Sequence, residues 1–326
     1  MMTLSIEAFH GEHCETTATG TLLKQLDIEL SEPMLFGLGE GLGFIFWKMK
    51  TMSFPFIGGR VKTDLLTQNI AKNLNLNLSV KETSSKQKAW DNVKQHLDQG
   101  EVVGLKLDCF HLDYFSNPIH FAGHYVAIYG YDEESAYLID TVQQGVRVKA
   151  SLENLTKARA EKGPMSSKSL HYTINRSGRS FELSSAIITA IRNNAIDFLN
   201  PPIANVGYKG IEKTSSEIIK WYKTSNNIES EFRISGMMME KAGTGGALFR
   251  NLYRDFLKES YQLLGLDTLR LAYEDFVEIA ALWTSIANLF EQVSRTKDFV
   301  YIEQASAILR SLAEKEKKAM ELLSKL

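Results

Sequence analysis

Three residues with the capacity for nucleophilic catalysis stand far apart in this sequence: Cys14, His124 and Asp140. Cys14 comes directly before a segment of helical periodicity, where unpaired N–H groups and the positive end of the helix dipole favour the thiolate. His124 opens a segment with the pattern of a strand, and Asp140 ends the next one. A short turn between the two strands would place Asp140 beside His124, so that the carboxylate orients an imidazole able to deprotonate the thiol.

Each of these residues also has a purely structural explanation. A lone cysteine is usually a small buried apolar residue, which is the favoured interpretation of the second cysteine, Cys109. His124 could be a hydrogen-bonded strand residue, and Asp140 could cap a turn.

A second polar cluster precedes His124. It contains acceptable zinc ligand types, but its spacing matches no known ligand motif, so no metal site is predicted. We interpret the cluster as a pocket wall that leads into the His124 strand. Its members are Asp108, His111, Asp113 and His120.

The secondary structure that must position these residues is predicted to change along the chain, from mixed helices and strands to helices alone. Helical periodicity alternates with short β-branched or aromatic strands up to the polar segment at 175–180, and Gly58-Gly59 indicates a loop. From Leu183 onward the pattern is almost entirely helical, which predicts an antiparallel bundle. The fold class is therefore α+β, with domains at 1–178 and 179–326. Expected helices are 16–26, 64–74, 86–97, 183–199, 212–222, 246–264, 268–290 and 299–326; expected strands are 101–107, 125–131, 136–139, 146–148 and 170–174.

Composition limits the class of function. The 326 residues include 37 Lys and Arg against 39 Asp and Glu, for a formal net charge of -2, and 44% are hydrophobic. A near-neutral chain has no general field for nucleic acid or anionic membrane. Two cysteines cannot form a disulfide framework, the start lacks the pattern of a signal peptide, and no apolar run approaches the roughly 20 residues of a membrane helix. We therefore expect a cytoplasmic protein that binds neither nucleic acid nor membrane.

The order of a helix-capping Cys, a strand His and a neighbouring-strand Asp resembles papain-like cysteine enzymes, including the peptidase domain of bacteriocin-exporting transporters. Five segments in one order are similar to the butirosin biosynthesis protein H family, and together they extend over nearly the whole chain. These segments are His13-Cys14-Glu15-Thr16-Thr17, Phe36-Gly37-Leu38-Gly39-Glu40-Gly41-Leu42, Gly59-Arg60, His120-Phe121-Ala122-Gly123-His124-Tyr125 and Gly243-Thr244-Gly245-Gly246 followed by Phe249-Arg250.

This resemblance implies an acyltransferase of secondary metabolism with a papain-like first domain. Cys14 would take an acyl group from a phosphopantetheine thioester on an acyl-carrier protein, and His124 would shuttle the proton. An aminoglycoside-like amine would then accept the acyl group. The implied enzyme holds no permanently bound cofactor, and a homodimer is compatible with the sequence.

Several further residues are candidates for binding. Gly245 and Gly246 precede a predicted helix, whose N-terminus could bind a carrier phosphate, although a plain loop with Thr244 as its cap is slightly favoured. Arg250 could receive an acidic carrier helix or be solvated. Glu40, in the glycine-rich stretch from Gly37 to Gly43, could meet a cationic acceptor or be an exposed turn carboxylate. We expect the glycines around it to let backbone approach backbone beside the nucleophile helix.

The sequence departs from papain-like hydrolases at the oxyanion donor. Those enzymes use a Gln shortly before the Cys, whereas residues 1–13 contain neither Gln nor Asn. The Cys14 backbone N–H can supply one donor, and the side chain of His13 or His10 could supply another. This weakens the case for peptide hydrolysis more than for thioester chemistry. A cysteine peptidase or amidase and a non-catalytic papain-like binding scaffold remain as alternatives.

Overall fold

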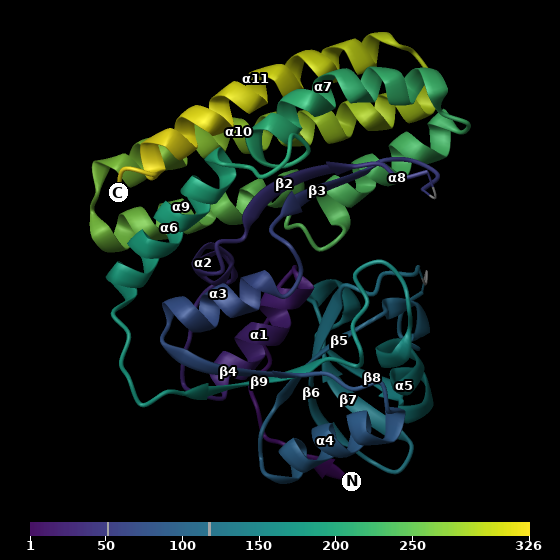
Figure 1. Cartoon of the computed structure of the whole chain (residues 1–326), viewed down its shortest axis with the longest axis vertical. Helices are drawn as coiled ribbons and strands as arrows, with labels where there is room; N and C mark the ends of the chain where they lie inside the picture. The colour runs from purple at the N-terminus through teal and green to yellow at the C-terminus, as the bar shows by residue number, and fades with distance from the viewer. Residues whose placement is uncertain (51, 117–118) are drawn as a thin grey trace. The chain divides into compact units, whose positions relative to one another are not determined.

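The computed structural model describes residues 1–50, 52–116 and 119–326 (Figure 1). The chain forms two compact units: unit 1 is Met1–Leu35 with Thr63–Phe181, and unit 2 is Phe36–Lys62 with Glu182–Leu326. The predicted α+β class, with a sheet in the first part and helices in the second, is confirmed.

Unit 1 is built on an antiparallel sheet, which has seven strands within the described residues. Its strand order is β4-β9-β5-β6-β7-β8, and β1 pairs with the end of β6. The central strand β5 is buried at every position, including the charged Lys106. The strands are β1 (Met2–Thr3), β4 (Leu76–Lys81), β5 (Val103–Leu107), β6 (His124–Tyr131), β7 (Ser135–Ile139), β8 (Arg147–Ser151) and β9 (His171–Arg176).

Helices cover both faces of this sheet. Val93 of α4 (Lys86–Asp98) and Leu155 of α5 (Leu152–Ala160) share an apolar core with Leu105 of β5. Tyr172 of β9 pairs with Gly104, the neighbour of Leu105, and so points to the opposite face. There its hydroxyl lies 3.2 Å from Thr19 Oγ1 of α1 (Cys14–Lys24). Helix α1 therefore covers the other face, beside α3 (Leu65–Asn73).

Unit 2 is a group of long helices that pack side by side, with α10 against α8, α9 and α11, and α11 against α7 (Figure 1). Large apolar side chains of α10, including Trp283 and Phe290, are buried at its centre. The helices are α6 (Leu183–Leu199), α7 (Gly207–Thr224), α8 (Ile228–Lys241), α9 (Arg250–Leu264), α10 (Asp267–Thr296) and α11 (Val300–Leu323), and a 3-10 turn, η3 (Ala247–Phe249), precedes α9.

A two-stranded hairpin, β2 (Leu42–Trp47) and β3 (Phe56–Arg60), also belongs to unit 2. The Phe44 ring packs on Trp283 with centroids 5.6 Å apart, and the Phe46 N–H donates to Asn205 O at 2.9 Å. The predicted contiguous division at 178/179 therefore differs from the compact units, because the buried aromatic side chains of β2 pack among the helices. The helix before the hairpin, α2 (Glu32–Leu38), has residues in both units.

The glycines of this region permit close packing, in part as predicted. Gly59 lies within β3 rather than in a loop, and a Cβ there would stand 2.2 Å from Leu248 O. A Cβ on Gly37 would meet the Phe256 ring of α9 at 2.2 Å. At Gly43 backbone approaches backbone, as predicted, since a Cβ there would stand 2.8 Å from the backbone carbon of Arg60.

A buried ion pair holds the hairpin, η3 and α11 together. Arg250 and Glu316 are both fully buried, and Arg250 Nε and Nη2 donate to the two Glu316 carboxylate oxygens at 2.9 and 2.8 Å. Arg250 Nη1 donates to Gly59 O at 3.2 Å, and Trp283 Nε1 donates to Glu316 Oε1 at 2.5 Å. The expectation that Arg250 contacts a carrier protein is therefore wrong: its guanidinium is enclosed and its hydrogen bonds are used within unit 2.

The backbone before Arg250 is left-handed over five consecutive residues, from Gly245 to Phe249. Three of them are not glycine, and each non-glycine residue in this region costs about 1–2 kcal/mol. The Ala247 N–H donates to Glu240 Oε1 at 3.1 Å, which helps to hold the turn. The helix predicted over 246–264 therefore begins only at Arg250.

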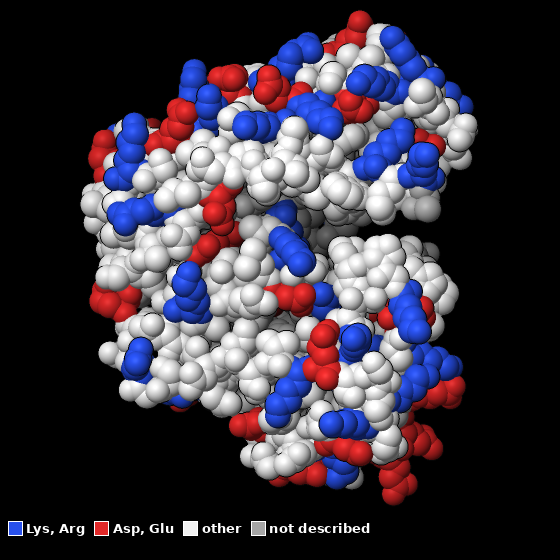
Figure 2. All heavy atoms as spheres, in the orientation of Figure 1, with Lys and Arg blue, Asp and Glu red and all other residues white. Residues whose placement is uncertain are grey.

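Charged side chains of both signs are interspersed over the face drawn in Figure 2, in keeping with the near-neutral composition. Among the described residues, no helix combines the length and the apolar character that crossing a membrane requires.

We predict that Glu316→Ala lowers the free energy of unfolding by about 3–5 kcal/mol, because it leaves the Arg250 charge buried without a partner. Urea unfolding followed by circular dichroism measures this. Glu314→Ala, at an exposed position of the same helix, is the matched control and should change stability by less than about 0.5 kcal/mol. Equal effects of the two substitutions would contradict a structural role for the ion pair.

Candidate active site

The first helix of unit 1 positions the candidate nucleophile. Helix α1 begins at Cys14 itself, after His13 in extended conformation. The first residues of a helix have N–H groups without a partner inside the helix, so a negative charge on the Cys14 side chain would be favoured there. Cys14 is 8% exposed, which leaves the sulfur close to the surface of unit 1 without being fully accessible.

A carboxylate distant in sequence fixes the loop that leads into this helix. Glu32 accepts hydrogen bonds from the backbone N–H groups of Glu12 and His13, at 2.9 and 2.8 Å, and from the Thr16 hydroxyl at 2.7 Å. Burial raises the pKa of Glu32, and these hydrogen bonds oppose the rise. Sequence reasoning missed Glu32, since no local pattern links it to the residues around Cys14.

Two neighbouring strands bring the candidate base and its partner together. The register of β6 and β7 pairs Ala127 with Ile139, so that His124 and Asp140 lie at the same end of the strand pair. The Asp140 N–H donates to Val146 O at 2.9 Å, which fixes the backbone just beyond β7. His124 Nε2 lies 2.8 Å from Asp140 Oδ2, the pairing expected from the sequence.

The Asp140 carboxylate is fully buried and accepts three hydrogen bonds. Oδ2 accepts from His124 Nε2 and from the Tyr114 hydroxyl, both at 2.8 Å, and Oδ1 accepts from the Thr141 N–H at 2.7 Å. Burial and the charge of Asp140 raise the pKa of Tyr114, so the hydroxyl remains a donor. Tyr114 is a second site residue that the sequence did not reveal.

The imidazole of His124 is hydrogen-bonded to Asp140 and interacts electrostatically with Cys14. Burial by itself lowers the pKa of His124, but the charge of Asp140, interaction with Cys14 and the hydrogen bond to Asp140 outweigh it and raise the pKa well above 6.5. Because Nε2 faces Asp140, Nδ1 is the nitrogen left for the thiol. The Phe115 ring meets the imidazole edge-on, with centroids 5.4 Å apart, and limits its rotation.

A backbone contact joins the two parts of the site. The Val142 N–H, two residues after Asp140, donates to Gly11 O at 2.9 Å, three residues before Cys14. A Cβ on Gly11 would stand 2.6 Å from Thr17 Oγ1 and 2.8 Å from Glu32 Oε1. Glycine at this position therefore lets the loop lie close to both the Glu32 carboxylate and helix α1.

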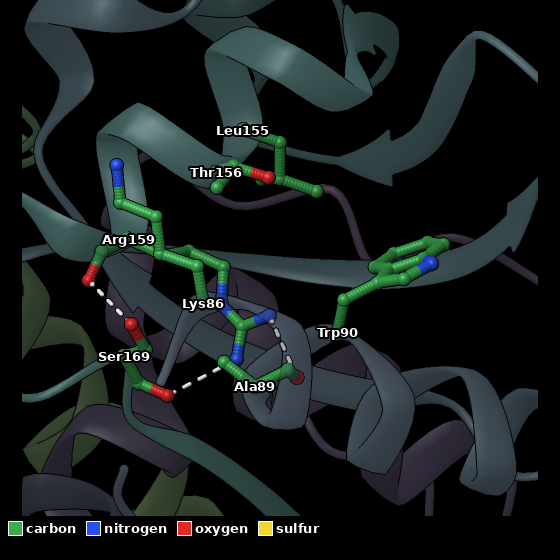
Figure 3. A pocket seen from close by; sticks show the side chains of 7 residues that line it. All are labelled: Lys86, Ala89, Trp90, Leu155, Thr156, Arg159 and Ser169. Carbon is green, nitrogen blue, oxygen red and sulfur yellow. Dashed lines mark hydrogen bonds between the residues drawn. The ribbon is translucent and has the colours of Figure 1, made fainter. Parts of the chain in front are cut away.

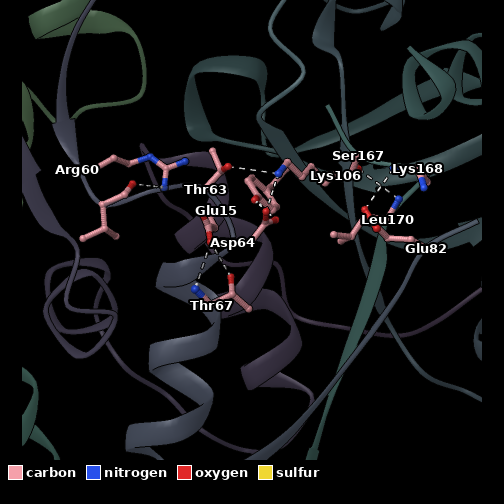
Figure 4. Close-up of polar contacts among 12 residues, drawn as sticks. Glu15, Arg60, Thr63, Asp64, Thr67, Glu82, Lys106, Ser167, Lys168 and Leu170 are labelled. Carbon is pink, nitrogen blue, oxygen red and sulfur yellow. Dashed lines mark hydrogen bonds and ion pairs between the residues drawn. The ribbon is translucent and has the colours of Figure 1, made fainter. Parts of the chain in front are cut away.

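Buried polar contacts attach α1 to α3 and α3 to the sheet (Figure 4). Glu15, next to Cys14, accepts from the N–H and hydroxyl of Thr67, at 3.2 and 3.1 Å. The Lys106 ammonium donates to Asp64 Oδ2 at 2.6 Å and to Thr63 Oγ1 at 3.3 Å. These contacts make the helix that carries Cys14 part of a rigid framework.

The candidate oxyanion and pocket residues lie in different surroundings. His13 is 3% exposed and its Nδ1 lies 3.4 Å from Thr16 Oγ1, while His10 is exposed. The side chain of His120 is 59% exposed, and its ring stacks on Phe110 with centroids 4.0 Å apart.

Glu40 belongs to unit 2 and is not an exposed turn carboxylate. Its side chain is buried and accepts a hydrogen bond from Asn193 Nδ2 at 3.0 Å.

The glycines proposed for phosphate binding have internal partners. The Gly246 N–H donates to Thr244 Oγ1 at 3.1 Å, and the next N–H in the left-handed turn, that of Ala247, meets the Glu240 carboxylate. Thr244 thus caps this loop, which was the favoured interpretation of the sequence, and a carboxylate of unit 2 meets an N–H at which a phosphate could have bound.

The Asp and His side chains of the predicted polar cluster before β6 each contact a different partner. Asp108 meets His120 at 3.3 Å, His111 meets Glu161 at 2.7 Å, and Asp113 accepts from the Ser151 N–H. Within the described residues, no group of three or more His, Cys, Asp or Glu side chains could hold a metal ion. Cys109 is buried and donates to Ile119 O at 3.4 Å, as expected of a structural thiol.

Two family models match the chain. The model described as "Butirosin biosynthesis protein H, N-terminal" matches residues 13–141, which include Cys14, His124 and Asp140. A model described as "Domain of unknown function (DUF4872)" matches residues 153–323, slightly more than half of the chain. Its start lies in α5 of unit 1, so the family boundary and the compact units do not coincide. Among curated proteins, none matches the chain significantly.

The raised pKa of His124 predicts a pH dependence of stability. Between pH 6.5 and the folded-state pKa, the folded protein holds a proton that the unfolded chain has released, so the free energy of unfolding falls as pH rises through this window. The slope should reach up to about 1.4 kcal/mol per pH unit. The His124→Gln/Asp140→Asn double variant removes both charges and should lose this component in urea unfolding measured from pH 6 upward. An unchanged slope would show that another group is responsible.

Proposed function

The chain belongs to the butirosin biosynthesis protein H family, and from this membership we propose that it is a cysteine-dependent acyltransferase. The family connects the chain to enzymes of antibiotic biosynthesis. The observation that carries the proposal is the hydrogen bond of His124 to the fully buried Asp140 carboxylate, together with the interaction of His124 with Cys14 at the start of α1.

The first step forms an acyl-enzyme. In keeping with its raised pKa, His124 holds the proton of the Cys14 thiol at Nδ1 as an imidazolium, and the sulfur attacks the carbonyl carbon of a donor thioester. The tetrahedral intermediate then breaks the bond to the donor sulfur, and the departing thiol takes the proton from His124. Asp140 keeps its negative charge throughout and stabilises the imidazolium.

The second step transfers the acyl group to an amine. The acceptor nitrogen attacks the carbonyl carbon of acyl-Cys14 while His124 takes a proton from that nitrogen. The carbon–sulfur bond breaks, an amide is released, and the proton returns to Cys14. An aminoglycoside-like amine as acceptor and an acyl-phosphopantetheine on a carrier protein as donor are the substrates that we propose.

The developing oxyanion would lie near the start of α1. The Cys14 N–H is available there because the first residues of a helix have no partner inside it. His13, directly before the nucleophile, is the side chain that we propose as the second donor, since removing one oxyanion donor typically costs about 10²–10³ in turnover. The carbonyl of a thioester is already activated. The oxyanion formed from it therefore needs less stabilisation by these donors than the oxyanion formed from a peptide.

We predict that incubation with an acyl-N-acetylcysteamine thioester adds one acyl group to the protein, seen as a mass increase of the intact chain. Cys14→Ala should abolish the adduct. Cys109→Ser is the matched control, because it removes the other cysteine, and should form the adduct as the wild type does. Equal labelling of the Cys14→Ala protein would exclude Cys14 as the nucleophile. If water removes the acyl group from Cys14 but an added aminoglycoside does not accept it, the protein is a hydrolase instead.

We predict that Tyr114→Phe slows acylation of Cys14 by about ten- to a hundred-fold, because a hydrogen bond to a charged group contributes roughly 1.5–3 kcal/mol. Tyr114 acts through Asp140 as a positioning residue. Removing its hydroxyl makes Asp140 a stronger base and should raise the pKa of His124, so the pH–rate profile should shift upward. A slower rate with an unshifted profile would indicate that Tyr114 matters only for packing.

A further inference from the structure

A small cavity lies in unit 1 between α4 and α5, on the side of the sheet that these helices cover (Figure 3). Its volume is about 10 Å³, which is roughly the room that one water-sized particle needs. Arg159, at the end of α5, forms part of the wall. The remaining lining residues are Lys86, Ala89, Trp90, Leu155, Thr156 and Ser169.

Arg159 is a buried cation without a counterion. It is 4% exposed, and its Nη1 and Nη2 donate to the backbone oxygens of Ala89 and Ser169, at 3.1 and 3.0 Å. Its Nε has no hydrogen-bond partner, and no carboxylate forms an ion pair with it among the residues that the structure describes. Burial lowers the pKa of Arg159 to about 10, which still leaves the guanidinium charged at neutral pH.

A second buried residue, His171, provides no counterion for Arg159. His171 is 1% exposed, and neither of its ring nitrogens has a hydrogen-bond partner. Burial, followed by the charge of Arg159, lowers the pKa of His171 to about 4. Within the cavity wall, Arg159 Nε is therefore a buried polar nitrogen without a partner, and such groups in folded proteins generally indicate an ion or water that completes them.

The other buried cations of this chain show how such a charge is normally balanced. Lys106 is paired with Asp64 at 2.6 Å, and Arg250 is paired with both oxygens of Glu316. Burial of an unpaired charge costs several kcal/mol, whereas pairing it offsets most of that cost. Arg159 departs from this pattern, and it does so at the wall of a cavity.

We propose that this cavity binds a small monatomic anion of the chloride class, held by Arg159. The small volume of the cavity favours a monatomic ion over phosphate, sulfate and carboxylate ligands. Lys86, an exposed residue at the start of α4, also lines the cavity and carries a positive charge. The hydroxyls of Thr156 and Ser169 already donate to backbone oxygens, so the cations provide the attraction. The anion would join α5, α4 and the segment before β9 in one electrostatic contact.

The proposal is tested on the full chain by chloride-35 NMR and thermal unfolding. The chloride line should broaden with the wild-type protein and narrow again when bromide competes. At constant ionic strength, replacing gluconate with chloride should raise the melting temperature saturably, by about 2–4 °C at ten times the dissociation constant. Both effects should disappear in Arg159→Met and persist in Arg192→Met, which removes an exposed arginine of α6.

Two outcomes would overturn the proposal. One is equal chloride dependence in the wild type and in Arg159→Met. The other is a wild type that neither broadens the chloride line nor gains stability in chloride, in which case water fills the cavity. Should Arg159→Met fail to fold, wild-type crystals soaked in bromide decide the question. An anomalous peak beside the Arg159 guanidinium supports the site, and its absence rejects it.

Discussion

The candidate active site depends on one buried negative charge, the carboxylate of Asp140. Three hydrogen bonds hold it: from His124, from Tyr114 and from the backbone of Thr141. A fully buried carboxylate is tolerated only when its oxygens are satisfied in this way. The same contacts fix the orientation of His124 and raise its pKa, so the stability of unit 1 and the state of the imidazole have a common origin.

The position of Cys14, the candidate nucleophile, depends on a second carboxylate that takes no part in the proposed chemistry. Glu32 holds the loop before α1 through two backbone N–H groups and the Thr16 hydroxyl. Gly11 then joins that loop to the residue two beyond Asp140. The helix that carries Cys14 and the strands that carry His124 and Asp140 are thus connected by main-chain contacts, and the position of the sulfur does not rely on side-chain packing alone.

In unit 2 a buried ion pair connects structural elements and is not part of the candidate active site. Arg250 and Glu316 connect η3, the β2–β3 hairpin and α11. The residues just before Arg250 form a turn with positive φ angles, a conformation that is unfavourable for the three of them that are not glycine. The glycine-rich segment that resembled an anion site is therefore a structural turn, whose nearest carboxylate is Glu240. A short glycine motif before a helix predicts exposed N–H groups, but the rest of the fold decides what meets them.

The sequence by itself determined the α+β class, the main strands and helices and the order of Cys14, His124 and Asp140, because these follow from hydrophobic periodicity and from residue chemistry that acts locally. It did not determine the hairpin β2–β3, whose glycines looked like a loop, or the roles of Glu32, Tyr114, Arg250 and Glu240. Only the tertiary structure decided those. A buried polar group takes its partner from whatever the fold places within hydrogen-bond distance, here up to 191 residues away along the chain, and no local pattern carries that information.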